Sequence, residues 1–316
     1  MFTAEHALVN CIKEWSGSGS IGDDCALIAG GHLLTTDTLV EGTHFAIPLI
    51  SWGDLGWKAI AVNLSDIAAM AGRPRHVLTS ITVAPHLHKS DFEALFKGMV
   101  ECCKQYQCQI VGGDLTRGTV ISITVTVHGD VHENGMLSRA GAKPGDVIAV
   151  TGDFGASAAG WWLLENRRHE APNFPHCREA HVHPLPRLCE AWSAIRATGD
   201  RGALMDASDG LADALVQIAR LSKVGMQVDL EKLPINEQTI SAAKLAKVNP
   251  LDWALYGGED YELVACIPQS VWDGWQTDNP FRMIGHVTES HRIVLKMGHA
   301  DGPEINLSKC FEQISF

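Results

Sequence analysis

The sequence predicts an α/β protein of two domains, and three observations indicate this class. The chain has 316 residues, which is more than a single hydrophobic core usually serves. Segment 138–146, SRAGAKPGD, has turn chemistry and is followed by a new strand pattern, so it is the best candidate boundary. Beyond it, helical and strand patterns alternate. We therefore expect domains at residues 1–137 and 138–316.

Composition excludes several partners. The formal charge is −12, from 37 acidic and 25 basic residues, and such a surface repels nucleic acid and anionic membranes. No apolar stretch approaches the roughly 18 residues of a membrane span, and the N-terminus lacks the pattern of an export signal. The nine cysteines are scattered without a C-x-x-C pair, which is typical of reduced, mostly buried thiols. These features predict a cytoplasmic protein with neither nucleic-acid nor membrane partners.

The first elements are a helix, a loop and a hairpin. Apolar residues at helical spacing predict a helix over Ala4–Trp15. The glycine-rich segment 16–22 matches G-x-G-x-x-G, but a dinucleotide fingerprint follows a strand and opens a helix, whereas a helix precedes this one. We interpret it as a mobile loop. Cys25–Ile28 and His32–Leu39 then read as two strands joined by a Gly-Gly turn.

The same stretch, from Ile21 to Phe45, gathers Asp23, Asp24 and Asp37 beside hydroxyl groups with almost no basic residue. Crowded carboxylates repel one another, so they take up protons or share cations. Carboxylate and hydroxyl oxygens suit Mg²⁺, which usually accompanies a phosphate. This stretch therefore predicts a magnesium and nucleotide site.

A buried helix is expected over Leu55–Ala71, and it carries Lys58 and Asp66 in a nearly uncharged run. A buried aspartate needs a partner. Asp66 either pairs with a neighbouring backbone or with Lys58, or it shares a metal ion with Asp24 and Asp37.

The rest of the first domain should be a strand over Arg75–Ala84, a helix over Ser90–Gln105 with Ser90 as N-cap, and two further strands. Ile110–Asp114 reads as a strand that ends in two glycines and an acid, which either form a plain turn or admit a phosphate to the backbone. Strict alternation over Thr119–Val131 predicts a long, half-exposed strand. Strands of this kind often pair at a subunit interface, so a homodimer is plausible.

In the second domain a strand over Val147–Thr151 and a helix over Phe154–Glu165 come first. We expect 165–181 to be a surface excursion. In and just after it lie residues of the types that bind zinc, namely His176, Cys177, His181 and His183. Their spacing fits no standard tetrahedral site, so we interpret them as ordinary loop side chains. We interpret His86 and His88, earlier in the chain, in the same way. Pro184 and Pro186 then lead to a helix that begins near Arg187.

Two more acidic motifs follow. In LMDASDGLADAL a short strand leads into Asp206, Ser208 and Asp209 and then into an amphipathic helix near Gly210, which Ser208 or Asp209 could cap. In YGGEDYEL, glycines precede Glu259 and Asp260 just before a strand. Surface solubility does not explain repeated Gly/Asp motifs at strand ends.

Taken together, the motifs point to one family. No P-loop and no protein-kinase signature is present. However, GDDCA, TTDTLVEGTHF, NLSDIAAMAG, VGGDLTRG, DASDGL and GGEDYEL occur in the order and spacing of thiamine-monophosphate kinases, which the chain resembles from Gly22 to about Val264. These kinases belong to the superfamily of aminoimidazole ribonucleotide synthetase and selenophosphate synthetase.

The resemblance implies a homodimer of two-domain α/β subunits of the aminoimidazole ribonucleotide synthetase type. Their N-terminal sheets pack across the dimer, and a cleft holds ATP, several Mg²⁺ ions and thiamine monophosphate. The product would be thiamine diphosphate, formed by direct transfer, with Asp37, Asp66 and Asp206 as the catalytic acids. By motif position the implied magnesium ligands are Asp24, Thr35, Thr36, Asp37, Asp66, Asp114, Asp206 and Asp209. The implied ATP contacts are Gly113, Asp114, Arg139 and Ser208, and the implied contacts to thiamine monophosphate are His44, Glu259 and, in the C-terminal tail, Phe311.

Some features stay open at this level. The aromatic that would stack on adenine falls at Phe96 or Tyr106. Another ATP-dependent synthetase of the superfamily is the first alternative, but the loop at 16–22 lacks the reactive cysteine and lysine of selenophosphate synthetases. A non-catalytic nucleotide sensor is the second alternative, and such a protein should have lost some of the metal-binding acids that this chain keeps.

Overall fold

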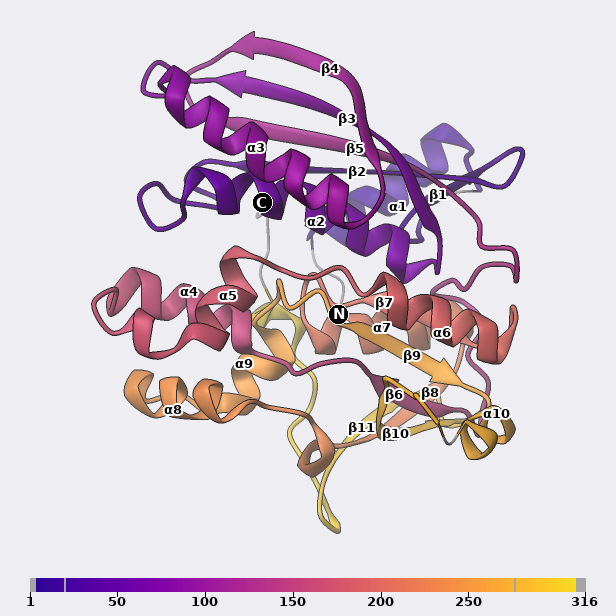
Figure 1. Ribbon diagram of the computed structural model, residues 1–316. Coiled ribbons are helices and arrows are strands. Elements are labelled where there is room, and N and C mark those ends of the chain that lie inside the picture. The colour runs from indigo at the N-terminus through magenta and orange to yellow at the C-terminus, as the bar shows by residue number, and fades with distance from the viewer. Residues whose placement is uncertain (1–3, 20, 276, 311–316) are drawn as a thin grey trace.

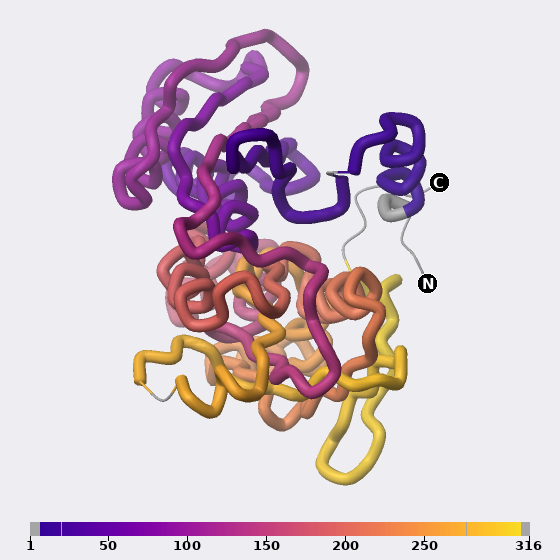
Figure 2. Tube along the Cα trace, turned by 90° about the vertical axis from the view of Figure 1, so that its right-hand side faces the viewer, coloured from indigo at the N-terminus to yellow at the C-terminus, as the bar shows by residue number. Residues whose placement is uncertain are grey.

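The computed structural model describes residues 4–19, 21–275 and 277–310 and arranges them in two layered halves (Figure 1). The first half contains the strands β1 (Ala26–Ile28), β2 (His32–Val40), β3 (Arg73–Val83), β4 (Gln109–Arg117) and β5 (Ser122–Asp130), with the helices α1 (Ala4–Ser16), α2 (Trp52–Ala69) and α3 (Lys89–Gln105). Its sheet has the order β1-β2-β5-β3-β4, in which only the β3–β4 pair is parallel. Helix α1 lies apart from this sheet (Figure 2).

Alternation along β5 gives the first sheet two different faces. Ile123, Val125 and Val127 are fully buried, whereas the residues between them are partly exposed. The buried face packs against α2 and α3, which lie on the same side of the sheet (Figure 1). The predicted hairpin is confirmed because β1 pairs with β2 antiparallel, and the predicted half-exposed strand is confirmed by this alternation along β5.

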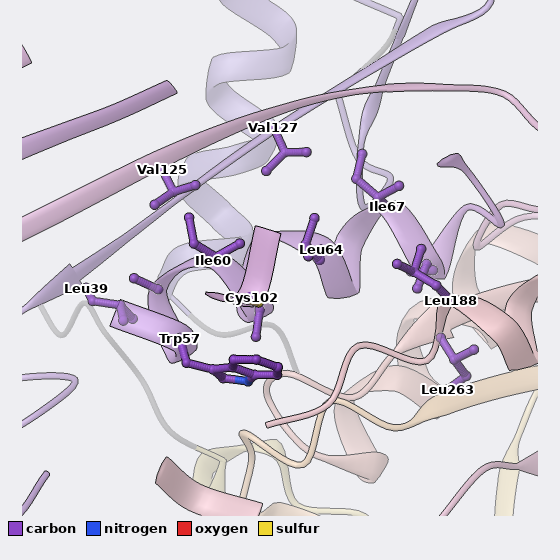
Figure 3. Close-up of a cluster of buried hydrophobic side chains, with 14 of the residues drawn as sticks. Leu39, Trp57, Ile60, Leu64, Ile67, Cys102, Val125, Val127, Leu188 and Leu263 are labelled. Atoms are coloured by element: carbon purple, nitrogen blue, oxygen red, sulfur yellow. The ribbon is translucent and has the colours of Figure 1, made fainter. Parts of the chain in front are cut away.

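Helix α2 is the core of the molecule. Ser51 caps it by accepting a hydrogen bond from the Asp54 amide. Its apolar residues face the first sheet at Val125 and Val127 and the second half at Leu188 and Leu263 (Figure 3). A helix that is apolar on nearly all sides is buried on nearly all sides, so the few polar groups of α2 are held inside the protein.

Two details of the first half differ from the sequence predictions. The N-cap of α3 is His88 and not Ser90, because the carboxylate of Asp91 accepts the His88 amide and closes a capping box that starts the helix two residues earlier. The strand expected to end at Asp114 continues to Arg117 as β4. A glycine is required at position 113 because a Cβ would lie 1.9 Å from the Thr79 carbonyl oxygen of β3.

The second half contains β6 (Val147–Val150), β7 (Ala203–Asp206), β8 (Gly225–Asp229), β9 (Leu263–Ile267), β10 (Arg282–Thr288), β11 (Ile293–Met297) and β12 (Ala300–Asp301). Its helices are α4 (Ala156–Asn166), α5 (Pro175–Val182), α6 (Leu188–Thr198), α7 (Leu211–Ser222), α8 (Glu237–Ala246), α9 (Pro250–Tyr256) and α10 (Gln269–Gly274), with short 3₁₀ turns at Ala171–Asn173, Leu230–Lys232 and Leu307–Lys309. The sheet order is β12-β11-β8-β10-β6-β9-β7, with β8 and β11 parallel.

This second sheet is covered on both faces. Along β6, Val147 and Ala149 join the core that also holds α4 and α6, whereas Ile148 and Val150 join the core of α7 and α9. A strand buried on both faces reads as a continuous apolar run, as VIAV does. The α/β class is confirmed, and the boundary at residue 138 stays a prediction.

The predicted surface excursion over 165–181 is wrong in its second part. Residues 175–182 form α5, which packs against α4 and buries Cys177 and His181. A Cβ on Gly160 would lie 2.0 Å from the Cys177 carbonyl oxygen, so this small residue lets the two helices approach closely. Among the described helices, none is long and apolar enough to cross a bilayer.

Candidate active site

A pocket of about 780 Å³ lies where the two halves meet. Its walls come from β2, the loop at 43–44, α2, α4 and the two acidic motifs of the second half. The sequence-predicted residues that line it are Asp24, Thr35, Thr36, Asp37, His44, Asp66, Arg139, Ser208, Asp209 and Glu259. All of the predicted motifs except VGGDLTRG therefore converge, although they are distant along the chain.

Three carboxylates form the centre of the site. Asp24 precedes β1, Asp66 lies in the last turn of α2, and Asp206 ends β7. One oxygen atom from each lies within 4.8 Å of the other two. The hydroxyl of Ser65 donates to Asp206 at 2.5 Å, and the hydroxyl of Thr35 donates to Asp66. The site thus combines acids from both halves with hydroxyl groups that hold them in place.

Burial, together with neighbouring negative charge, raises the pKa values of Asp206, Asp66 and Asp23. Burial, followed by the charge of Asp24, raises the pKa of Asp206 to about 7. Burial and the charges of Asp37 and Asp206 raise the pKa of Asp66 well above its ordinary value. Burial and Asp24 likewise raise the pKa of Asp23 to about 6. A cluster of this kind binds protons when no cation is present.

Arg139 supplies part of the missing positive charge. Its guanidinium donates to both carboxylate oxygens of Asp24, at 3.0 and 2.7 Å, and its amide donates to Asp23 at 3.1 Å. The arginine predicted to contact ATP therefore lies next to a predicted metal ligand. A bidentate pair of this geometry is strong. Asp66 and Asp206 form no ion pair of their own within the described part of the chain.

The residues present fit a divalent cation. Oδ1 of Asp206 is buried and accepts no hydrogen bond within the described part of the chain. A buried carboxylate oxygen without a donor is costly. An all-oxygen donor set of carboxylates and hydroxyls suits Mg²⁺, so the cluster matches the predicted chemistry.

The β2 residues of the predicted magnesium set point in different directions. The side chain of Thr35 joins the acid cluster, and the Asp37 amide donates to Asn63 of α2 at 2.9 Å. The Thr36 hydroxyl instead donates to the carbonyl oxygen of Val125 at 3.0 Å. Because successive side chains of a strand alternate, the Thr36 hydroxyl points away from the face that carries Thr35.

Backbone hydrogen bonds join the two acidic motifs of the second half. The Glu259 amide donates to the Ser208 carbonyl oxygen at 2.6 Å, and the Tyr261 amide donates to the Ala207 carbonyl oxygen. Glu259 and Tyr261 have φ values of 56° and 52°, and strained backbone of this kind is common at functional sites. Helix α7 has Gly210 as its N-cap and no side-chain cap, so neither Ser208 nor Asp209 serves as the cap.

Sequence reasoning missed the surroundings of Glu259. Nζ of Lys58 lies 3.1 Å from its carboxylate, and Nδ1 of His181 lies 3.3 Å from it. Burial would raise the pKa of Glu259, but Lys58 and His181 outweigh it and lower that pKa. Lys58 was visible only as a partner for Asp66, and the interpretation of His181 as a loop residue is wrong because α5 buries it against the pocket. His44 also lines the pocket, and its Nδ1 accepts the Val40 amide.

An aromatic wall was also missed. Trp161, Trp253, Tyr256 and Tyr261 line the pocket. Tyr256 and Tyr261 belong to the motif YGGEDYEL, of which only the acids were singled out, and no motif marked the tryptophans. The predicted Phe311 lies outside the described residues. Phe96 and Tyr106 do not line this pocket: Phe96 borders a separate depression on α3, and Tyr106 packs against Trp57 with ring centroids 6.0 Å apart.

Gly113 and Asp114 are not brought to the site by this chain. Across the first sheet, Thr38 is aligned with Thr124, then with Ser80, and then with Asp114. Three strand spacings separate β2 from β4, which is about 14 Å. Asp114 is exposed on this edge strand, so it does not join the acids around Asp66 within one subunit.

Comparison with known proteins identifies the class first. Residues 22–131 match the family model for the N-terminal domain of AIR synthase related proteins, and residues 143–298 match the model for their C-terminal domain. The two halves of the molecule, which meet at the acidic pocket, thus correspond to the two domains of AIR synthase related proteins.

Relatives of this chain identify its family within that class. The thiamine-monophosphate kinase of Bacillus subtilis (strain 168) is 36% identical over 296 residues, covering 87% of this chain and 88% of that protein. The thiamine-monophosphate kinase of Aquifex aeolicus (strain VF5) is 35% identical over 297 residues, covering 92% and 93%. The solved structure of AaThiL complexed with AMPPCP and TMP is similar with a TM-score of 0.85, 32% identity and 95% coverage of both chains. The chain belongs to the thiamine-monophosphate kinase family.

Proposed function

We propose that this protein transfers the γ-phosphoryl group of ATP to thiamine monophosphate and releases thiamine diphosphate and ADP, with Mg²⁺ held by the acid cluster. The observation that carries this proposal is the convergence of Asp24, Asp66 and Asp206 in a pocket of a chain whose relatives are thiamine-monophosphate kinases. A non-catalytic sensor would have no need to keep these costly acids together.

The reaction needs little from the protein beyond positioning and charge. An anionic phosphate oxygen of thiamine monophosphate forms a bond to the γ-phosphorus of ATP, while the bond from that phosphorus to the β,γ-bridging oxygen breaks. The nucleophile is already an anion, so no general base is required. Bound Mg²⁺ would neutralise charge on the phosphate oxygens, and we propose that it is held by Asp24, Thr35, the Thr36 backbone, Asp37, Asp66, Asp206 and Asp209.

The other predicted contacts have plausible chemistry in the same pocket. The thiazolium ring of thiamine carries a positive charge, which suits the ionised carboxylate of Glu259, with His44 nearby. Arg139 and Ser208 remain the proposed ATP contacts. Among the aromatic residues, the pocket-lining tryptophans are candidates for packing on thiamine, and the role of Phe311 stays a prediction.

We further propose that the working unit is a homodimer in which Gly113 and Asp114 complete the site of the partner. The support is that Asp114 is exposed on β4, about 14 Å across the sheet from β2 by strand spacing. Leu78, Val111 and Leu115, which are 48%, 53% and 63% exposed, add apolar surface to β3 and β4 at this edge of the sheet, with Leu78 on the same face as Asp114. Exposed apolar patches of this kind mark interaction surfaces.

A product assay tests the function. Purified protein with Mg²⁺ and ATP would be offered thiamine monophosphate, thiamine and aminoimidazole precursors in separate reactions, with products identified by mass spectrometry. We expect one added phosphoryl group on thiamine monophosphate alone. Asp37→Asn should nearly abolish this product while the protein stays folded. Phosphorylation of thiamine instead, or full activity of Asp37→Asn, would contradict the proposal.

A cytoplasmic location is also proposed. Its support is that the nine cysteines are free in the described chain, and six of them are buried, as expected for a protein of a reducing compartment.

A further inference from the structure

A second cluster of metal-binding side chains lies on the first sheet, outside the pocket. His32 begins β2, while His128 and Asp130 end β5. His32 is aligned with Asp130 across the β2–β5 pair, and His128 is aligned with His76 across the β5–β3 pair. Residues aligned across strands share a face, as do residues two apart along a strand. The three neighbouring strands therefore present all four side chains on one face.

Three ligand atoms of this cluster converge. Nδ1 of His32 lies 3.0 Å from Oδ1 of Asp130 and 3.1 Å from Nε2 of His128, and the last two atoms are 3.9 Å apart. Ligand atoms held tetrahedrally around Zn²⁺, at bonds of about 2.0 Å, lie about 3.3 Å from one another. The observed triangle matches one face of such a tetrahedron. In the single chain the side chains of His32, His128 and Asp130 are 44%, 29% and 33% exposed, and they lie on the same face of the sheet as Leu78 and Asp114 of the proposed dimer surface.

One hydrogen atom cannot satisfy both acceptor atoms of this triangle. Nδ1 of His32 has one hydrogen at most, and it faces two atoms that can both accept it. His128 is best assigned with its proton on Nδ1, where it donates to Nδ1 of His76 at 3.1 Å, so that its Nε2 has a free lone pair. A cation with three open coordination positions would satisfy all three atoms together.

The neighbours of the cluster orient these atoms as metal ligands require. A coordinating histidine usually donates its other N–H group to an acceptor, which His76 provides for His128. Nε of Arg75 donates to Oδ2 of Asp130 at 2.7 Å and leaves Oδ1 facing the histidines.

From this geometry we propose that His32, His128 and Asp130 form a binding site for a divalent transition-metal ion, with Zn²⁺ as the best match, and that His76 positions His128. Imidazole nitrogen suits Zn²⁺, whereas Mg²⁺ prefers oxygen ligands. This site is therefore chemically distinct from the acid cluster of the pocket. All ligands come from one chain, so the site needs no second copy, and the ion would fasten β2 to β5.

Calorimetric titration of untagged full-length protein with Zn²⁺ tests the proposal, with excess Mg²⁺ present to occupy the pocket. We expect one saturable Zn²⁺ site per chain in the wild type. His32→Ala and His128→Ala should each lose it, and His76→Phe should keep the stoichiometry but bind about 10- to 100-fold more weakly. His86→Ala is the matched control, because His86 is an exposed histidine of the same half that pairs with Glu41 instead, and it should bind as the wild type does.

Equal Zn²⁺ binding by the wild type and by the His32→Ala/His128→Ala double variant would overturn the assignment. If the variants do not fold, the wild type alone decides through Co²⁺. Four-coordinate Co²⁺ absorbs visible light much more strongly than six-coordinate Co²⁺, so strong absorption in the presence of excess Mg²⁺ supports the site. Its absence refutes the site.

Discussion

Lys58 and Glu259 form an ion pair between the two halves of the molecule, with Nζ of the lysine 3.1 Å from both carboxylate oxygens of the glutamate. The Lys58 side chain is 1% exposed, whereas that of Glu259 keeps 30% of its surface exposed. Helix α2 thus carries a buried positive charge whose partner lines the pocket. The pair fixes where the predicted thiamine-binding carboxylate points.

Replacing Lys58 with methionine should weaken the binding of thiamine monophosphate and also lower the stability of the protein. Without the ammonium group Glu259 loses its counter-charge, and we expect the KM for thiamine monophosphate to rise about 10- to 100-fold, more than the KM for ATP. Removing one partner of a buried pair should also lower the free energy of unfolding by about 1–3 kcal/mol. Steady-state kinetics and urea denaturation measure the two effects.

The double variant Lys58→Met/Glu259→Gln provides the control. It removes both charges, so most of the lost stability should return while the KM for thiamine monophosphate stays high. Equal effects of Lys58→Met on the two substrates would argue against a special link between this lysine and the thiamine end of the pocket.

Asp66→Asn should increase stability and abolish activity together. The carboxylate of Asp66 is buried beside Asp24 and Asp206, so a neutral amide of the same shape relieves repulsion in the metal-free protein. We expect a gain of about 1–2 kcal/mol in the free energy of unfolding, loss of the stabilisation that Mg²⁺ gives the wild type, and loss of turnover. Thermal unfolding with and without Mg²⁺ measures this, with the exposed Asp301→Asn as control. A destabilised Asp66→Asn protein would contradict the repulsion argument.

The pH dependence of magnesium binding follows from Asp206. Burial and Asp24 raise its pKa to about 7, so the metal-free fold favours the protonated form. This contribution to stability is complete at low pH and is lost as the pH rises through about 7. Mg²⁺ should therefore raise the Tm clearly at pH 8 and much less at pH 5.5, where protons compete for the cluster. Asp206→Asn should remove most of this difference, and an Mg²⁺ effect independent of pH would exclude the mechanism.

The sequence predicted the acids but not the groups around them, for a physical reason. Glycine and aspartate at strand ends are a local signal, and Asp24 and Asp206 could be found from it, whereas Asp66 could be found as an acid in a nearly uncharged helical pattern. The pairing of Lys58 with Glu259 depends on how the two halves pack, which no local pattern encodes. His181 was misread because two prolines follow it, although the residues before them form α5.

The position of Asp114 relative to the other acids could not be predicted from the sequence for a different reason. Its motif was recognised, but the strand register across β5 and β3 separates it from the other acids, and register depends on tertiary pairing. The aromatic wall of the pocket was missed because tryptophans at helical spacing also read as ordinary core residues.

His181 should limit stability in acid. Burial, with the charge of Lys58, lowers its pKa to about 3, so the unfolded chain binds a proton near pH 6.5 while the folded protein does not. The free energy of unfolding should therefore fall between about pH 6.5 and pH 3, by on the order of 2–4 kcal/mol from this residue. His181→Gln should flatten this part of the stability curve, measured by urea denaturation. His86→Gln, at an exposed position, should leave it unchanged, and an equally steep curve for His181→Gln would refute the assignment.

Asp114→Asn and Asp66→Asn should each be inactive alone and should complement each other when mixed. If Asp114 acts in the partner's site, a mixed dimer has one site with both substitutions and one site that is intact. Random exchange of subunits makes half of the dimers mixed, so activity should recover to about one quarter of the wild-type value. Mixing Asp66→Asn with Asp37→Asn is the control: both residues lie on the same side of the pocket within one chain, so every site keeps a defect and no activity should return. Recovery in the control, or none with Asp114→Asn after subunit exchange is verified by mass spectrometry, would place Asp114 outside the partner's site.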